Sequence, residues 1–157
     1  MHLATYVGLL HSSLRTLADA FRAVGDGHGE EPDVKTTCQV LAGRIDGQVE
    51  RLGPIVERYG EHRESEPERL RAAEFEAGFT GARSGGVGLV RDLQDLYALT
   101  SFTDITWTVV GQAAQGLRDQ ELLDTVTAGT QDTARQLAWL RTRIKEAAPQ
   151  ALIAAHG

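Results

Sequence analysis

Six polar side chains fall near the middle of long helical patterns, at a level where the core of a helical bundle is ordinarily apolar. They are Gln48, Thr100, Thr103, Asp104, Thr133 and Gln136. Gln48 interrupts an apolar stripe with spacings of three and four that runs from Val34 to Ile55. Buried polar groups destabilise a fold unless they are hydrogen-bonded. Three interpretations stay open: a layer that fixes helix register, the lining of a small-molecule pocket, or a shifted register that turns some of these residues towards solvent.

A carboxylate-bridged di-metal site at this level would need a stricter pattern. In a four-helix bundle it takes a Glu from each of two helices and a Glu-x-x-His from each of the other two, because residues i and i+3 share a helix face. No histidine of this chain has an acidic residue three positions before it. Asp104 is the one carboxylate expected near the inner face, and neutral Gln and Thr side chains are poor ligands for such a centre. We therefore expect no metal ligands and no cofactor.

Smaller candidates lie elsewhere in the chain. His28 with Glu30 and Glu31 could hold a cation, but we interpret this glycine-rich stretch as a solvated turn. Cys38 has no second cysteine to pair with and is interpreted as a small buried hydrophobe. The stretch Ser84–Gly88 has the glycines of a phosphate loop but lacks the Lys-Ser/Thr that completes one, so it is interpreted as the start of a helix. No catalytic residue is assigned, and the pattern favours a protein that is not an enzyme.

Four stretches repeat apolar residues at the helical period, and no stretch predicts a pair of strands. The expected helices are 2–24, 33–59, 87–116 and 119–147. Short turns join the first to the second and the third to the fourth, so each pair is antiparallel. A connection over 60–86, with a short helix around Pro67–Glu76, is long enough to run the whole bundle, because a helix of about 25 residues spans only ~37 Å. The prediction is an all-α antiparallel four-helix bundle in a single domain, 1–157, with one long crossover.

This arrangement resembles the ferritin-like superfamily over nearly the whole chain, in architecture and not in a specific motif. The resemblance implies a di-iron or di-manganese site at mid-bundle, the level of the six polar residues. The chain departs from that pattern, since Asp46 and Gln48 are two residues apart and point in different directions. We interpret the segment around Gln48 as the vacated half of a metal-binding helix.

The third helix carries a second weakly polar stripe, made of Phe102, Thr106, Val109 and Ala113. Asp104 is the only charged residue between Leu96 and Leu117. A helix that is apolar on two faces is buried on two faces. Either the crossover or a second subunit covers this stripe, and we expect a homodimer.

Composition excludes some partners. The net charge of −6 and the pI near 5.3 argue against a general nucleic-acid binder, which would present a basic face. The first residues lack the basic start and cleavage site of a signal peptide, and the least charged window is too polar to span a membrane. One cysteine in 157 residues favours a reducing compartment, so we expect a cytoplasmic protein.

Three functions remain after these arguments. The first is a non-catalytic bundle with a structural or regulatory role, acting through homo-oligomerisation or a protein partner. The second is a small-molecule-binding bundle that uses the polar layer as its pocket. The third is a residual metal protein of oxidative-stress type, which the ferritin-like resemblance implies.

Overall fold

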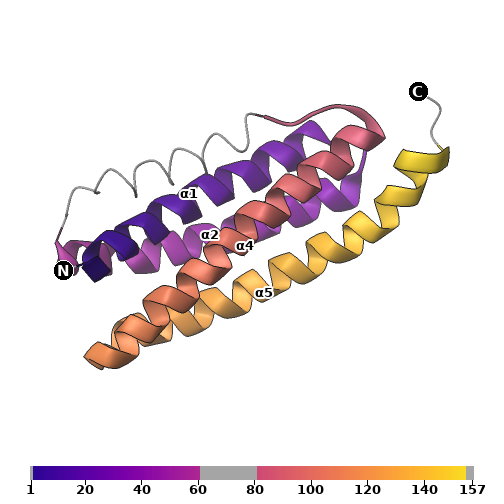
Figure 1. The fold of residues 1–157 in the computed structure, drawn as a ribbon. Coiled ribbons are helices and arrows are strands. Elements are labelled where there is room, and N and C mark those ends of the chain that lie inside the picture. Colours follow the sequence, from indigo (N-terminus) through magenta and orange to yellow (C-terminus); the bar gives the residue numbers. More distant parts are fainter. Residues whose placement is uncertain (1, 61–80, 155–157) are drawn as a thin grey trace.

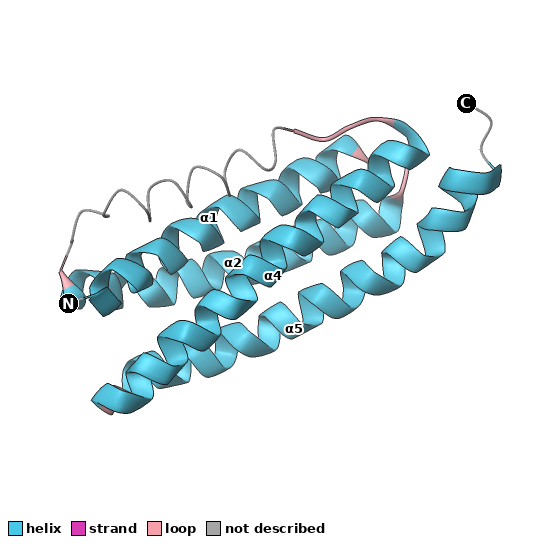
Figure 2. Cartoon of the chain, viewed as in Figure 1, coloured by secondary structure: helices cyan, strands magenta, loops and turns pink. Residues whose placement is uncertain are grey.

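The computed structural model describes residues 2–60 and 81–154, and within these ranges the chain forms helices and no strand (Figure 2). The elements are α1 (His2–Gly27), α2 (Pro32–Tyr59), α4 (Gly85–Leu117), α5 (Gln120–Pro149) and a short π-helix, η1 (Gln150–Ala154). They form the predicted all-α four-helix bundle, with α4 and α5 packed along α1 and α2 (Figure 1). Among the described helices, none combines the length and the apolar content needed to cross a lipid bilayer.

The predicted helix ends lie within three residues of the observed ones, and the differences have local causes. The first helix was predicted to stop at Val24, but Gly25 and Gly27 are not in the left-handed conformation that ends a helix, so α1 continues to Gly27. Gly60 caps α2, with φ of 83°. Pro149 is the last residue of α5, and the chain continues directly into the wider turns of η1.

The helix directions follow from contacts at the two ends of the bundle. At one end, the Tyr59 hydroxyl of α2 donates a hydrogen bond to Asp119, which begins α5. At the other end, His28 in the α1–α2 turn contacts Asp92 in the first turns of α4. Thus α2 ends beside the α4–α5 turn, and α2 and α4 run in the same direction (Figure 1). Residues 61–80 lie outside the described part, so the crossover and its short helix at Pro67–Glu76 stay predictions.

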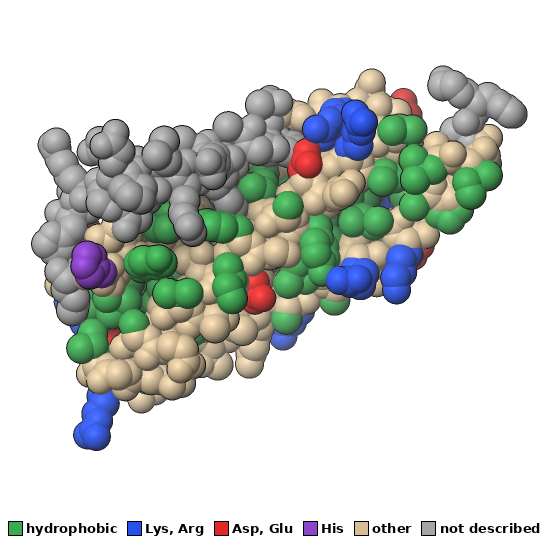
Figure 3. All heavy atoms as spheres, viewed as in Figure 1, with side chains coloured by type: hydrophobic (Ala, Val, Ile, Leu, Met, Phe, Trp, Pro, Cys, Tyr) green, Lys and Arg blue, Asp and Glu red, His purple; other side chains and the backbone are tan. Residues whose placement is uncertain are grey.

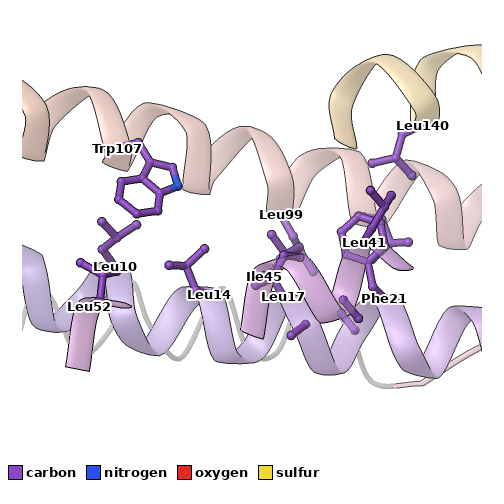
Figure 4. Close-up of a cluster of buried hydrophobic side chains, with 14 of the residues drawn as sticks. Leu10, Leu14, Leu17, Phe21, Leu41, Ile45, Leu52, Leu99, Trp107 and Leu140 are labelled. Carbon is purple, nitrogen blue, oxygen red and sulfur yellow. The ribbon is translucent and has the colours of Figure 1, made fainter. Parts of the chain in front are cut away.

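The core is a continuous stack of mainly aliphatic side chains (Figure 4). At one level of the bundle, the Trp107 ring fills the space between the helices. Trp107 is fully buried, near Leu10 and Leu52. Its ring lies directly on Gly129 of α5, where a Cβ atom would stand 2.2 Å from Cζ2. The missing side chain of Gly129 therefore makes the space that the indole fills, and α4 and α5 come close together there.

This contact predicts that Gly129→Ala destabilises the bundle although alanine is the better helix former. Because the new methyl group overlaps the Trp107 ring, we expect a loss of about 1–3 kcal/mol in the free energy of unfolding, as for other overpacked cores. Urea denaturation followed by circular dichroism measures it.

Gly116→Ala is the matched control, because a Cβ at Gly116 meets nothing within 4 Å. It should raise stability by ~0.5–1 kcal/mol through helix propensity alone. Equal stabilisation by both substitutions would contradict the contact between Trp107 and Gly129.

Candidate functional site

The six predicted polar residues lie in or beside two successive layers of the bundle. A hydrogen bond of 2.6 Å from Arg141 to Tyr97, together with the Trp107–Gly129 contact, fixes the antiparallel register of α4 and α5. This register places Thr103 level with Thr133, and Thr100 level with Gln136. Gln48 joins from α2, where its Nε2 donates to Asp132 of α5 at 3.0 Å. Five of the six are buried, and Asp104 is half-buried.

Two of the buried threonines are satisfied by their own helices. Thr103 Oγ1 donates to the carbonyl of Leu99 at 3.1 Å, and Thr133 Oγ1 donates to that of Gly129 at 2.8 Å. Other polar atoms in this region are buried without a partner: Gln48 Oε1, Thr100 Oγ1, Gln136 Oε1 and Trp107 Nε1. Such atoms are rare in native cores and ordinarily cost stability. Among the described residues, no three His, Cys, Asp or Glu side chains are grouped to hold a metal ion.

A second polar cluster lies at the end of the bundle and centres on Asp92. Its carboxylate is fully buried and belongs to the inner face of α4. The Arg83 backbone N–H donates to Oδ2 at 2.8 Å, and the Arg83 guanidinium donates to Oδ1 at 2.6 Å and to Asp95 at 2.9 Å. Hydrogen bonds with Asp95 and Asp92 raise the pKa of Arg83. The buried negative charge of Asp92 is therefore paired with a permanent positive charge.

His28 completes this cluster from the α1–α2 turn. The backbone places the ring, because the His28 N–H donates to Val24 and the His28 carbonyl accepts from Glu31. Its Nε2 lies 2.6 Å from Asp92 Oδ2. A carboxylate only accepts hydrogen bonds when ionised, so Nε2 carries the proton, and in the neutral ring Nδ1 has the free lone pair. Among the described residues, nothing donates a hydrogen bond to Nδ1.

His28 lines a cavity of about 210 Å³ between the α1–α2 turn and the start of α4. A neighbouring cavity of about 250 Å³ extends along the end of α5. The two share Glu31, Gly86 and Leu89, so they form one hollow region at this end of the bundle. The other residues that line it are Gly27, Glu30, Ser84, Gly85, Arg143, Glu146, Ala147, Gln150 and Ala151.

One wall of this hollow is the start of α4, which carries the partial positive charge of a helix N-terminus, and the opposite wall carries acidic side chains. Ser84 caps α4 only by position, since its side chain makes no capping hydrogen bond to the N–H groups of the first turn, which have no partner within the helix. Across from them, Arg143 is paired with Asp33 at 2.7 Å and with Glu31 at 3.1 Å, and Glu146 lies 3.9 Å away. Acidic groups therefore outnumber basic groups around Arg143.

Ser84, His28 and Asp92 are the residue types of a hydrolytic triad, and all three lie at this site. A triad needs the serine hydroxyl within hydrogen-bond reach of the imidazole. The described residues contain no hydrogen bond between Ser84 and His28. The contact that a triad needs is therefore not present between these two side chains.

The other predicted candidates are inert or lie apart. Cys38 is fully buried, and burial, followed by the nearby charge of Asp33, raises the pKa of its thiol to about 12. The thiolate that would be reactive is therefore scarce at neutral pH. Partial burial also lowers the pKa of His11 on α1, which is consistent with a boundary position.

The four predicted interface residues do not share one environment. Val109 is exposed, Phe102 and Ala113 are half-buried against the core, and Thr106 is buried with its hydroxyl bonded to the Phe102 carbonyl. Thr106 thus belongs to the interior of this chain. The exposed apolar face of α4 is rotated towards Ile105 and Leu117.

Comparison of the chain with protein-family models, curated proteins and solved structures found no match. The class of protein is therefore set by the fold, an all-α four-helix bundle with a polar mid-layer and a hollow, charged end. The resemblance to the ferritin-like superfamily stays a prediction.

Sequence reasoning named His28, Glu30 and Glu31 but placed them in a solvated turn, whereas the His28 ring is buried. It missed Asp92 and Arg83. One signal was available, because Asp92 lies three residues after Leu89 and four before Leu96, on the inner stripe of its helix. Arg83 gives no such signal, since it precedes the helix and its contact depends on the path of the chain.

The mid-layer predicts the outcome of Gln48→Leu. The substitution removes an unpaired buried oxygen together with the hydrogen bond from Nε2 to Asp132, and Asp132 keeps its contact with Arg135 at 3.2 Å. We expect the free energy of unfolding to be unchanged or raised by about 1 kcal/mol, since an unsatisfied buried acceptor is lost.

Chemical denaturation of wild type and Gln48→Leu measures this difference, with Gln136→Leu as a second variant in the same layer. A loss above about 2 kcal/mol would show that the hydrogen bond from Gln48 Nε2 to Asp132 outweighs the unpaired Oε1, and would contradict this prediction.

Proposed function

We propose that this protein is a non-catalytic binding bundle that takes a small molecule in the hollow between the α1–α2 turn, the start of α4 and the end of α5. The observation that carries the proposal is the His28 ring. It is 6 % exposed, is held by a fully buried carboxylate, and lines the cavity with one ring nitrogen that has no partner among the described residues.

Structural need alone does not account for His28. Arg83 already supplies two hydrogen bonds and a full positive charge to Asp92, so the carboxylate does not depend on the imidazole for neutralisation. Fixing a histidine through one nitrogen is a common way of presenting the other to a ligand.

In this proposal the ligand pocket is the end cavity and not the polar mid-layer. The polar mid-layer fixes the register of the helices. The parallel course of α2 and α4 supports ferritin-like topology, in which one long crossover joins the two helix pairs. The reducing, cytoplasmic setting expected from one cysteine fits a binder of small metabolites.

A second candidate function is self-association through α4. Ile105, Val109 and Leu117 are 57, 44 and 52 % exposed, and their spacings of four and eight place them along one side of the helix. No charged residue occurs between them. Figure 3 shows hydrophobic side chains spread over this face of the bundle. We name the partner as a second copy of this chain, because two neutral stripes can meet without bringing together the charges of a protein with net charge −6.

The binding proposal predicts that Gly86→Leu removes ligand binding and preserves the fold. Gly86 lines both cavities, and a Cβ there stands an ordinary 3.5 Å from Ala151, so the backbone accepts a side chain whose outer atoms fill the hollow. The measurement is NMR of the His28 ring protons during titration with amino acids, carboxylic acids, amines, sugars and nucleosides. At least one class should shift the wild-type signals and leave those of Gly86→Leu unchanged.

Gly116→Leu is the control, because Gly116 lies near the other end of the same helix in open space. It should bind as wild type does. If no class shifts the His28 signals of the wild type, the binding proposal is wrong.

The self-association candidate predicts that Val109→Asp gives a monomer. Wild type should be a dimer by light scattering, and a buried unpaired carboxylate at the interface should dissociate it without weakening the monomer. Thr130→Asp, on an exposed position of α5, is the control for added charge. A monomeric wild type, or a Val109→Asp variant whose own unfolding is destabilised, would show that no second copy covers this stripe.

A further inference from the structure

We infer that the ligand of the end cavity is a small zwitterion that carries an ammonium and a carboxylate on the same carbon, as an α-amino acid does. The inference rests on the proposed function, because it names the chemical class that the same cavity takes. It follows from three features of the cavity that make separate demands on the ligand.

The first feature is the wall made by the start of α4. Gly85 and Gly86 line the cavity, and neither has a side chain that would cover the backbone. The first N–H groups of this 33-residue helix have no intrahelical partner, and Ser84 does not cap them with its side chain. Such a helix start favours a carboxylate, through hydrogen bonds and through the positive end of the helix dipole.

The second feature is the acidic wall opposite. Glu30, Glu31 and Glu146 line the cavities, and the only basic side chain that lines them among the described residues is Arg143. Arg143 is already engaged by Glu31 and, outside the cavity, by Asp33. Glu30 makes no ion pair within the described part of the chain. This wall therefore retains excess negative charge and favours an ammonium group.

The third feature is His28, which is independent of both walls. Because Nε2–H donates its hydrogen bond to Asp92, Nδ1 of the neutral ring presents a lone pair that can accept a hydrogen bond from the ligand. An ammonium provides one, whereas a carboxylate or phosphate does not. The donor requirement of His28 and the excess charge of Glu30 and Glu31 thus point to the same group of the ligand.

Ligands with one pole fit less well. A simple anion would meet the helix start but would face the carboxylates and leave Nδ1 unpaired. A simple amine would satisfy His28 and the glutamates but would leave the N–H groups of α4 unmet. Leu89, Ala147 and Ala151 form an apolar part of the lining that suits a short aliphatic side chain.

The test compares ligands that differ by one pole. Glycine, L-alanine, L-valine and L-leucine are titrated into the full-length protein, with isocaproate and isoamylamine as leucine analogues that lack the ammonium or the carboxylate. Calorimetry gives the affinity, and the His28 ring signals in NMR give the location. We expect at least one amino acid to bind at His28, and leucine to bind about tenfold or more tightly than either analogue, a difference of ~1.4 kcal/mol.

One variant, with a matched control, tests the ammonium pole. Glu31→Gln should weaken amino-acid binding several-fold and leave isocaproate binding unchanged or improved, because it removes negative charge beside the ammonium. Glu57→Gln, an exposed position near the other end of α2, is the matched control and should change neither.

The possible failures are distinguishable. If isocaproate or isoamylamine shifts the His28 signals as strongly as leucine does, the cavity binds small molecules but the zwitterion inference is wrong. If none of the four amino acids binds, the inference is also wrong, and the wider panel with Gly86→Leu decides the proposed function separately. Binding that is equal in wild type and Gly86→Leu lies outside this cavity and overturns the inference.

Discussion

The buried charge of Asp92 is the constraint on which this end of the molecule depends. A carboxylate taken out of water must be paired and hydrogen-bonded, or the fold cannot tolerate it. Here its partners come from two separate places, the backbone and guanidinium of Arg83 before α4 and the imidazole of His28 after α1. One side chain therefore joins the α1–α2 turn to the start of α4. The hollow lies beside these polar contacts, and His28 lines it.

The bundle and its helix limits follow from the sequence because apolar residues recur at the helical period over the length of each helix. The inner face of α5 is less evident from the sequence. Thr130 is exposed, and the helix turns Thr125 and Gly129 inward. The reason is Trp107, whose ring requires a residue without a side chain opposite it. A glycine adds nothing to an apolar periodicity. That periodicity therefore does not mark Gly129, the position where the Trp107 ring packs on α5.

The candidate site was only partly predictable. Sequence reasoning found the polar mid-layer, because Gln48 breaks an apolar stripe, and it located His28 and Glu31 without recognising that the ring is buried. The burial of His28 is set by a partner sixty-four residues away, Asp92. No local pattern encodes a contact of that separation. Whether His28 is solvated, or is buried with one ring nitrogen facing a cavity, therefore depends on the arrangement of the helices.

The single thiol of Cys38 has a consequence for how the molecule opens. It is buried in α2 against Gly25, where a Cβ would lie 2.9 Å from that of Cys38, and it sits within a few turns of His28. With its pKa raised to about 12, the native thiol is both covered and protonated at neutral pH. A thiol reagent can therefore reach it only after α1 and α2 separate, so the rate of alkylation follows the opening of this helix pair. Alkylation of Cys38 would therefore measure how often α1 and α2 open at the end of the bundle that carries the proposed ligand cavity.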